Sequence, residues 1–313
     1  MSDEAPVDFR VVADFFGLPG TATVAKDIQV VRAVAAVAAI DAAPFRLVFG
    51  GGTALARAHR LIRRMSEDVD FKIVPLPAAP ISRSALRQQL GALRDRVTTA
   101  LWAAGFEFDP HDRAALRSRN ENRYTVYHLP YSESGVEEGL RATIQIELTY
   151  AALRLPPVTL PVSSFVSEAY GRSPEVSAMR CVSVTETAAE KLISLTRRTA
   201  MDLAGLSRDA DPALVRHIYD LHQLRNLVDA GEVADLAGTI AEADAEEFGN
   251  QYPAYAANIP GETRKALHAL QTDPLHRNRY DDFVSAMVYG ERVEFAVALG
   301  GVAEMVNRFV GKQ

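Results

Sequence analysis

The first half of the chain alternates between two patterns of hydrophobic and polar positions. Apolar residues spaced by three and four predict helices, whereas short runs of alternating apolar and polar residues predict strands. This mixture is typical of an α/β or α+β domain. The helices expected here cover residues 24–42, 53–63 and 82–104. The strands expected here cover residues 46–49, 68–74, 106–108, 123–129 and 142–150.

From about residue 182 the period becomes helical and remains so to the end. Ser183 and Glu186 form a capping-box pattern, and Asp211 followed by Pro212 is typical of a helix start. A polar stretch at 199–210 predicts a loop. The helices expected in this half are 183–198, 211–228, 233–248, 262–270, 280–289 and 292–309. We therefore expect an α+β fold, with a mixed sheet and helices in residues 1–175 and an α-helical domain in residues 176–313.

Composition narrows the class of protein. Of 313 residues, 48% are hydrophobic and 24% charged, as in ordinary folded soluble proteins. The only cysteine, Cys181, excludes an internal disulfide and a cysteine-based zinc site, which favours a reducing, cytoplasmic location. The apolar stretch 30–43 is too short to span a membrane and contains charges. A net charge of −6 excludes a uniformly basic surface but not a local basic patch.

The segment 66–71, Ser-Glu-Asp-Val-Asp-Phe, is the strongest local motif. Positions two apart in a strand point to the same face, so Asp68 and Asp70 would present two carboxylates side by side. Such a pair is unfavourable without a positive charge, and a divalent cation is a common partner. Taken alone, the pair is more often a solvated strand edge or a capped turn.

Upstream, a predicted strand ends in three glycines and a helix begins at Thr53. Glycines at such a point allow backbone amides to approach an anion. The order strand, Gly-Gly-Thr, helix and Asp-x-Asp strand would let a triphosphate with its magnesium bridge the two motifs.

Residues 51–56 and 66–71 together resemble the AbiEii family, nucleotidyltransferase-fold toxins of type IV toxin-antitoxin systems that include the mycobacterial MenT proteins. Lys191 and residues 216–221 are similar to the later motifs of that family. The resemblance implies a fold related to the DNA polymerase beta core, with Asp-x-Asp binding two magnesium ions. It covers about residues 48–224, and it departs from the family at His217, where an acid is usual.

The resemblance to nucleotidyltransferases implies a third carboxylate on a neighbouring strand. In residues 144–149, apolar Ile144 and Ile146 alternate with polar Gln145 and Glu147, which makes Glu147 the candidate. A purely solvent-facing role for Glu147 is an equally good interpretation of this pattern. The metal ligands expected are Asp68, Asp70 and Glu147.

Lys191 and Arg198, seven residues apart, share a helix face. On the resemblance, Lys191 would neutralise a triphosphate, and Asp220 would orient that lysine or act as a base. Without the resemblance, a surface ion pair between two helices would be the preferred interpretation.

These motifs predict a magnesium-dependent enzyme that moves a nucleoside monophosphate from a nucleoside triphosphate (NTP) to a hydroxyl. The expected catalytic residues are Asp68, Asp70, Glu147, Lys191 and Asp220. The expected nucleotide-binding residues are Gly51, Gly52, Thr53, Arg63, Arg64, Ser66 and Arg198. The resemblance implies that the acceptor is the 3′ end of transfer RNA, so that aminoacylation is blocked, and that an AbiEi-like antitoxin is encoded nearby.

An RNA acceptor would need a basic path. The candidates are Arg57, Arg60, Arg83, Arg87 and Arg94. Three alternatives stay open: a nucleotidyltransferase acting on a protein or small molecule, a glycosyltransferase that uses Asp-x-Asp, and a homologue that binds without chemistry, which His217 would favour.

Overall fold

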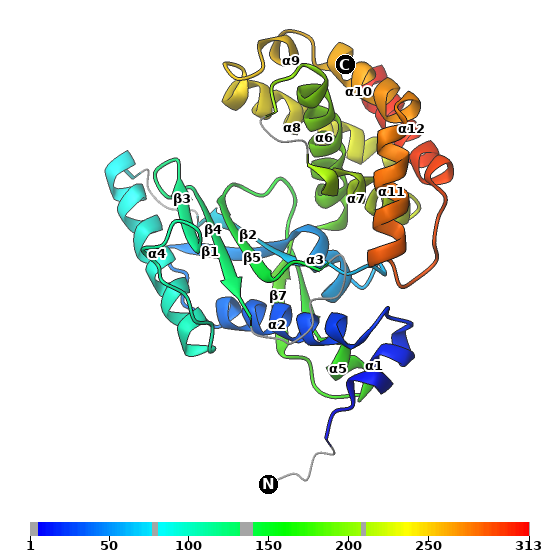
Figure 1. Cartoon of the computed structure of the whole chain (residues 1–313). Coiled ribbons are helices and arrows are strands. Elements are labelled where there is room, and N and C mark those ends of the chain that lie inside the picture. The colour runs from blue at the N-terminus through cyan, green and yellow to red at the C-terminus, as the bar shows by residue number, and fades with distance from the viewer. Residues whose placement is uncertain (1–5, 77–80, 132–139, 208–210, 313) are drawn as a thin grey trace. The chain divides into compact units, whose positions relative to one another are not determined.

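The computed structural model describes residues 6–76, 81–131, 140–207 and 211–312. The chain divides into two compact units, Met1–Val182 and Ser183–Gln313 (Figure 1). Residues 176–181, just after the division expected near residue 175, form the last strand of the first unit.

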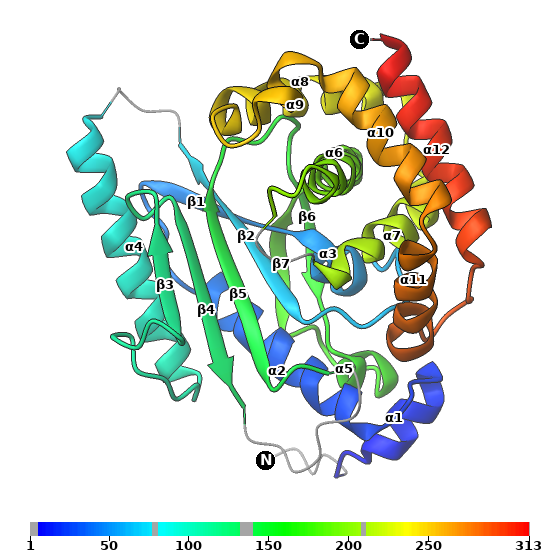
Figure 2. The same cartoon turned by 45° about the horizontal axis from the view of Figure 1, so that its top comes forward.

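The first unit is built on a seven-stranded mixed sheet in the order β3-β4-β5-β2-β1-β7-β6. Its central strand β2 pairs antiparallel with β1 and parallel with β5, and Figure 2 shows these strands side by side. The strands are β1 (Phe45–Gly50), β2 (Asp68–Pro75), β3 (Leu116–Arg119), β4 (Tyr124–Pro130), β5 (Thr143–Tyr150), β6 (Val158–Val162) and β7 (Val176–Cys181).

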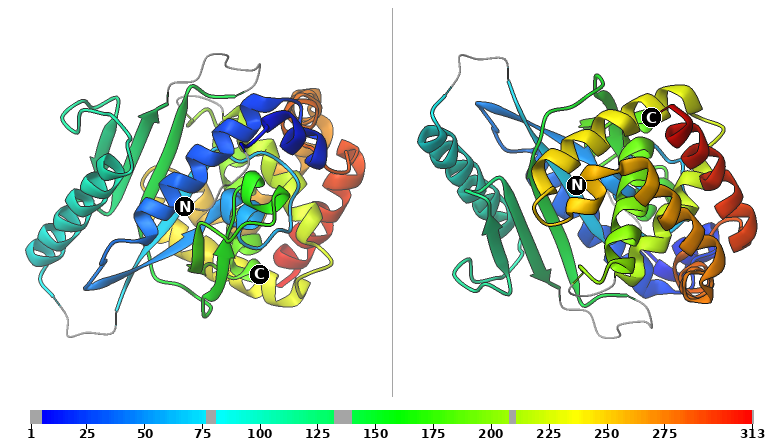
Figure 3. Two further views of the ribbon diagram at one scale, coloured as in Figure 1. Left: turned by 90° about the horizontal axis from the view of Figure 1, so that it is seen from below. Right: turned by 90° about the horizontal axis from the view of Figure 1, so that it is seen from above.

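Helices cover one face of this sheet. Helix α2 contacts β2, β5 and β7 and also packs against α4, and Figure 3 shows it lying across the strands. The Ser82 hydroxyl caps α4 by accepting a hydrogen bond from the Ala85 amide. The helices of this unit are α1 (Phe9–Phe16), α2 (Thr21–Ala38), α3 (Gly51–Arg57), α4 (Arg83–Ala103) and α5 (Phe165–Ala169).

Side chains alternate along β2 and along β5 between a face packed in the core and a polar face. Val69, Phe71 and Ile73 of β2 are buried, whereas the acids of that strand are only half-buried. Ile144 and Ile146 of β5 are buried in the same way. The sheet is therefore anchored through one face, and its acids are collected on the other.

The second unit is helical and is arranged around α6 (Val184–Leu203). This helix contacts α7, α8, α10 and α12, and it is seen end-on in Figure 2. The Ser183 hydroxyl accepts from the Glu186 amide at 3.2 Å, which confirms the predicted cap. The other elements are a 3-10 turn (Pro212–Val215), α7 (Arg216–Leu224), α8 (Ala230–Phe248), α9 (Pro253–Ala257), α10 (Ile259–Thr272), α11 (Pro274–Met287) and α12 (Phe295–Lys312).

Three local expectations are wrong. Residues 106–108 form no strand, because Phe106 and Phe108 pack beside α4 without strand partners. The helix expected to reach residue 63 ends at Arg57, and Arg60 then adopts a left-handed conformation that interrupts it (φ 58°). The loop expected over 199–210 begins only after α6 ends at Leu203, and residues 208–210 lie outside the described part.

No helix in the described part of the chain has both the length and the apolar character needed to cross a membrane.

Candidate active site

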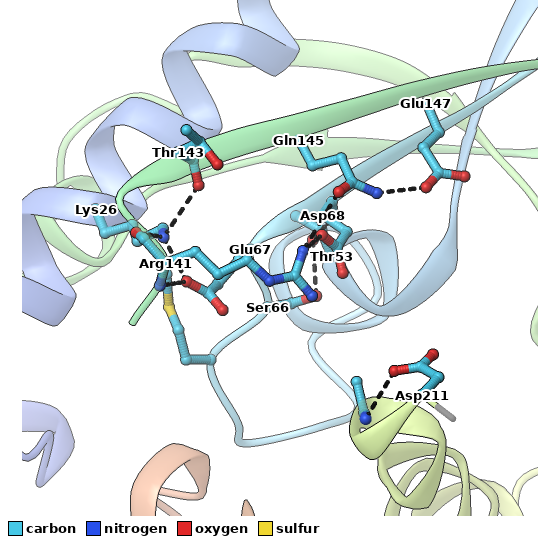
Figure 4. Close-up of polar contacts among 12 residues, drawn as sticks. Lys26, Thr53, Ser66, Glu67, Asp68, Arg141, Thr143, Gln145, Glu147 and Asp211 are labelled. Atoms are coloured by element: carbon cyan, nitrogen blue, oxygen red, sulfur yellow. Dashed lines mark hydrogen bonds and ion pairs between the residues drawn. The ribbon is translucent and has the colours of Figure 1, made fainter. Parts of the chain in front are cut away.

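The polar faces of β2 and β5 carry the three predicted acids on one side of the sheet. In the parallel register, Asp68 lies opposite Gln145, and Asp70 lies opposite Glu147. The Gln145 amide donates to the Glu147 carboxylate on the same strand (Figure 4). The predicted third carboxylate is thus directly beside the second one across the sheet.

Gly51 allows the carboxylate of Asp70 to occupy its position. Gly51 has a φ of 69°, in the left-handed region that favours glycine. A Cβ at Gly51 would lie 1.8 Å from Oδ2 of Asp70. The turn from β1 into α3 therefore lies directly against the second acid, and no larger residue fits there.

Gly52 also lies in close contact with neighbouring side chains. A Cβ there would lie 2.4 Å from Nη2 of Arg64 and 3.0 Å from the Ser66 hydroxyl. Arg64 is buried, and its Nη1 donates to the Met65 carbonyl at 2.9 Å. A buried guanidinium thus lies against the glycine turn, whereas Arg63 is exposed.

The Thr53 hydroxyl links the glycine turn to the acidic strand. It donates to the backbone carbonyl of Asp68 and lies 2.9 Å from the Ser66 hydroxyl. Thr53 is fully buried. Its hydroxyl therefore has a structural role that fixes α3 to the start of β2.

A buried ion pair lies next to Asp68. Lys26 of α2 donates to Glu67 and to the backbone carbonyls of Arg141 and Thr143. Burial lowers the pKa of Lys26, and the Glu67 carboxylate opposes that shift. The pair fixes the residue that precedes Asp68 to the beginning of β5.

Two further residues contact the acids. Nη1 of Arg141 donates to Oδ1 of Asp68 at 2.6 Å. Burial raises the pKa of Tyr124 on β4, as do the negative charge of Glu147 and the hydrogen bond to it, while Asp70 adds a smaller effect. The phenol of Tyr124 therefore stays protonated, and it lies close enough to Glu147 to be influenced by that charge.

In the second unit, the predicted lysine and acid form a buried pair. Lys191 Nζ lies 2.9 Å from Oδ2 of Asp220, and both side chains are buried. Nδ1 of His217 is 3.5 Å from the same Nζ, and its Nε2 is 3.5 Å from the Ser194 hydroxyl. The pair therefore links α6 to α7 inside this unit.

Arg198 lies one turn beyond that region of α6. Its Nη2 donates to Oδ2 of Asp211 at 2.7 Å, and about 40% of its side chain is exposed. The side chain of Arg198 is therefore partly open to solvent.

The glycine turn, the acid pair and the third acid form one arrangement, and it lies within the segment that a known family shares. The family described as "Nucleotidyl transferase AbiEii toxin, Type IV TA system" matches residues 32–300. The chain belongs to the AbiEii family. It is thus a nucleotidyltransferase toxin of the type IV toxin-antitoxin class, and this class implies an antitoxin partner.

The AbiEii assignment agrees with the fold. The structure is similar to that of MenT4, a nucleotidyltransferase toxin from Mycobacterium tuberculosis, with a TM-score of 0.58 and 18% sequence identity. The match covers 98% of this chain and 91% of that chain. At this identity the likeness shows the shared fold alone. No curated protein matches the chain.

Membership of the AbiEii nucleotidyltransferase family suggests an NTP substrate and a divalent metal. Carboxylate oxygens are the ligands that magnesium prefers, and Asp68, Asp70 and Glu147 supply them on one face. Among the described residues, no three His, Cys, Asp or Glu side chains are gathered into a ready metal cluster. The positive charge beside Asp68 is instead the guanidinium of Arg141. The residues fit a divalent cation by chemistry and by face.

The basic path expected in this AbiEii chain needs one correction. The prediction that Arg57 contacts RNA is wrong. Its side chain is buried between Asp27 and Glu168 and lies over the Phe165 ring. Arg60 is half-exposed. Arg83 and Arg87 line an open hollow of about 840 Å³ along α4, where Arg83 pairs with Glu121. Arg94 pairs with its neighbour Asp95.

Sequence reasoning missed Lys26, Tyr124 and Arg141. Each is a single residue without a motif, and each becomes visible only through sheet register or long-range pairing.

Proposed function

We propose that this protein transfers a nucleoside monophosphate from an NTP to the 3′ hydroxyl of transfer RNA, with magnesium as cofactor. The observation that carries the proposal is the register that sets Asp70 beside Glu147, with Asp68 on the same face. Blocking the 3′ end would prevent aminoacylation and stop translation, which suits a toxin.

Asp68, Asp70 and Glu147 would hold the divalent cation. Magnesium in such a site supplies charge neutralisation for a triphosphate and a lower pKa for the attacking hydroxyl. The carboxylates position that charge, and the sheet keeps them in register.

The glycine turn would bind the phosphates. Gly51 and Gly52 have no side chain to block an approaching anion, and the Arg64 guanidinium lies beside Gly52. Ser66 and Arg63 would add polar contacts, while Thr53 would act by fixing the turn. In the second unit, Lys191 and Arg198 would offset phosphate charge, and Asp220 would orient Lys191.

The reaction is balanced without a further reagent. The 3′ oxygen of the RNA bonds to the α-phosphorus, the bond from that phosphorus to the β-phosphate bridging oxygen breaks, and pyrophosphate leaves. The hydroxyl proton passes to a base of the site or to water. Fixed positive groups at the phosphates stabilise the transition state.

Each α-labelled NTP, incubated with the protein, magnesium and total RNA, tests the proposal. We expect label on tRNA, release of pyrophosphate, and no label with Asp68→Ala. Label on a protein or small molecule would replace tRNA as the acceptor. Release of nucleoside diphosphate from an added nucleotide sugar, with no transfer from any NTP, would indicate a glycosyltransferase. NTP binding without transfer to any acceptor would indicate a non-catalytic homologue.

A further inference from the structure

Arg141 stands just before β5, and its backbone is held by the buried ion pair. Its amide donates to Oε1 of Glu67 at 2.7 Å, and its carbonyl accepts from Lys26. The side chains of Lys26 and Glu67 are 0% and 1% exposed. The backbone position of Arg141 is therefore fixed by a charged pair in the core.

The side chain of Arg141 is held much less firmly. Nη1 donates to Oδ1 of Asp68 at 2.6 Å, and its distance to Oε1 of Gln145 is 3.5 Å. The side chains of Arg141 and Asp68 are 38% and 29% exposed, and ion pairs open to water are weak. The guanidinium can therefore leave Asp68 while the backbone stays in place.

Asp68 is also the carboxylate that would bind a divalent cation. A guanidinium and a cation compete for the same oxygens, because each needs them as ligands. The other preferred partner of a guanidinium is phosphate, which has a matching arrangement of oxygens. A metal bound to a triphosphate brings a cation for Asp68 and an anion for Arg141 together.

We propose that Arg141 is a substrate-binding residue of this site, which neutralises Asp68 in the free protein and moves onto the triphosphate when metal and nucleotide bind together. The inference rests on the proposed function. It makes metal binding dependent on nucleotide, since a metal alone must displace Arg141 without offering it a new partner. By linkage, the metal tightens nucleotide binding by the same factor.

The test measures binding without turnover. Mn²⁺ alone is titrated into the full chain by electron paramagnetic resonance, and the α,β-methylene analogue of each NTP is then titrated with Mn²⁺ present. We expect Arg141→Gln to bind Mn²⁺ alone about tenfold more tightly, because a competing positive charge is gone. The same variant should bind the analogue with Mn²⁺ about tenfold more weakly, because a phosphate contact is lost.

Two variants act as controls. Arg141→Lys keeps the charge, so its Mn²⁺ affinity should remain near that of the wild type, with analogue binding between the other two. Arg113→Gln removes one exposed arginine of the same unit and should match the wild type in both titrations.

Unchanged or weaker Mn²⁺ binding in Arg141→Gln would overturn the inference, as would unchanged binding of the analogue. Asp68→Asn separates this failure from a failure of the proposed function. If Asp68→Asn weakens Mn²⁺ binding but Arg141→Gln has no effect, only the role of Arg141 is wrong. If Asp68→Asn also has no effect, the metal site itself is wrong and both proposals fall.

Discussion

Gly51 shows at the scale of one residue how the sequence permits the site. Its left-handed φ and the 1.8 Å approach of a built Cβ to Asp70 are two separate reasons for glycine. Gly171 shares the first reason, with a φ of 61°, but has no atom within 4 Å of a built Cβ. Alanine substitutions at the two positions therefore distinguish the effect of backbone strain, which both share, from displacement of Asp70, which only Gly51 would cause.

Gly51→Ala should abolish nucleotide transfer, whereas Gly171→Ala should leave it near the wild-type rate. Both alanines cost about 1 kcal/mol of folding stability, because L residues disfavour this backbone conformation. Only Gly51→Ala also pushes the Asp70 carboxylate from its position. Thermal unfolding and the labelled transfer rate measure the two effects. Equal activity in the two variants would contradict the role given to Gly51.

At this scale, the sequence predicted the acid pair and its third partner because alternation along a strand is a local property. Asp68 and Asp70 needed only the two-residue period and the family motif, whereas for Glu147 the alternation gave the face of the strand and left its role open. Arg141 could not be predicted, because its contact with Asp68 depends on the pairing of β2 with β5, across more than seventy residues of chain.

At the scale of elements, α2 places two adjacent charges of opposite sign in the core. Lys26 holds Glu67 at the start of β2, and Asp27 accepts from the Phe165 amide at 2.6 Å and pairs with Arg57 of α3. One helix thus anchors both elements that carry the glycine turn and the acids.

Lys26→Met should destabilise the first unit by roughly 3–5 kcal/mol, because the Glu67 charge remains buried without its partner. Adding Glu67→Gln should recover most of this loss, since the neutral amide can still accept from the Arg141 amide. The free energy of unfolding is measured in urea from the fluorescence of Trp102, which lies in α4 and is the only tryptophan in the sequence. As a control, Arg83→Met in α4 removes an exposed ion pair with Glu121 and should leave the free energy of unfolding unchanged. A double variant no better than Lys26→Met would refute the role of the ion pair.

Asp27 gives a pH dependence with a definite sign. Burial raises its pKa to about 6, while Arg57 and the Phe165 amide oppose the shift. A raised carboxyl pKa favours the protonated folded state, so its contribution is complete below pH 3.8 and is lost as pH rises through 6. Relative to Asp27→Asn, the wild type should lose about 2 kcal/mol between pH 4 and pH 7, because part of the loss already occurs below pH 4. The control Asp14→Asn, at an exposed position, should show the same dependence of stability on pH as the wild type. If Asp27→Asn also showed that dependence, the raised pKa of Asp27 would be contradicted.

The helical period of apolar residues predicted most of the helices, since α2, α4, α6 and α8 are long and have apolar stripes. The strands β3, β6 and β7 were missed because they are short, and two of them are edge strands with exposed positions. The helix α3 was predicted too long because the apolar positions after Arg57 pack in the core without helical backbone.

At the scale of the whole molecule, the net charge of −6 says little about RNA. Three of the acids lie on one face of β2 and β5, where a bound cation would offset their charge. The side chains of Arg60, Arg83 and Arg87 are exposed, although Arg60 pairs with Glu168 and Arg83 with Glu121. RNA phosphates can therefore reach all three arginines.

We therefore expect affinity for tRNA to fall steeply with added salt, because phosphate contacts release bound counterions. Arg83→Gln together with Arg87→Gln should weaken binding and lower the slope of log affinity against log salt by about 2. Filter binding between 50 and 200 mM salt, roughly the range over which the effect is large, measures it. Salt-independent affinity would contradict an RNA path over α4.

The most direct measurement is the rate at which α-labelled nucleotide appears at the 3′ end of purified tRNA with magnesium. Asp70→Asn and Glu147→Gln, one from each paired strand, are compared with Asp112→Asn, an exposed acid of the same unit. The account predicts loss of transfer by at least about a thousandfold in the first two variants, with folding intact, and wild-type transfer in the third. Transfer that survives in both Asp70→Asn and Glu147→Gln would contradict it.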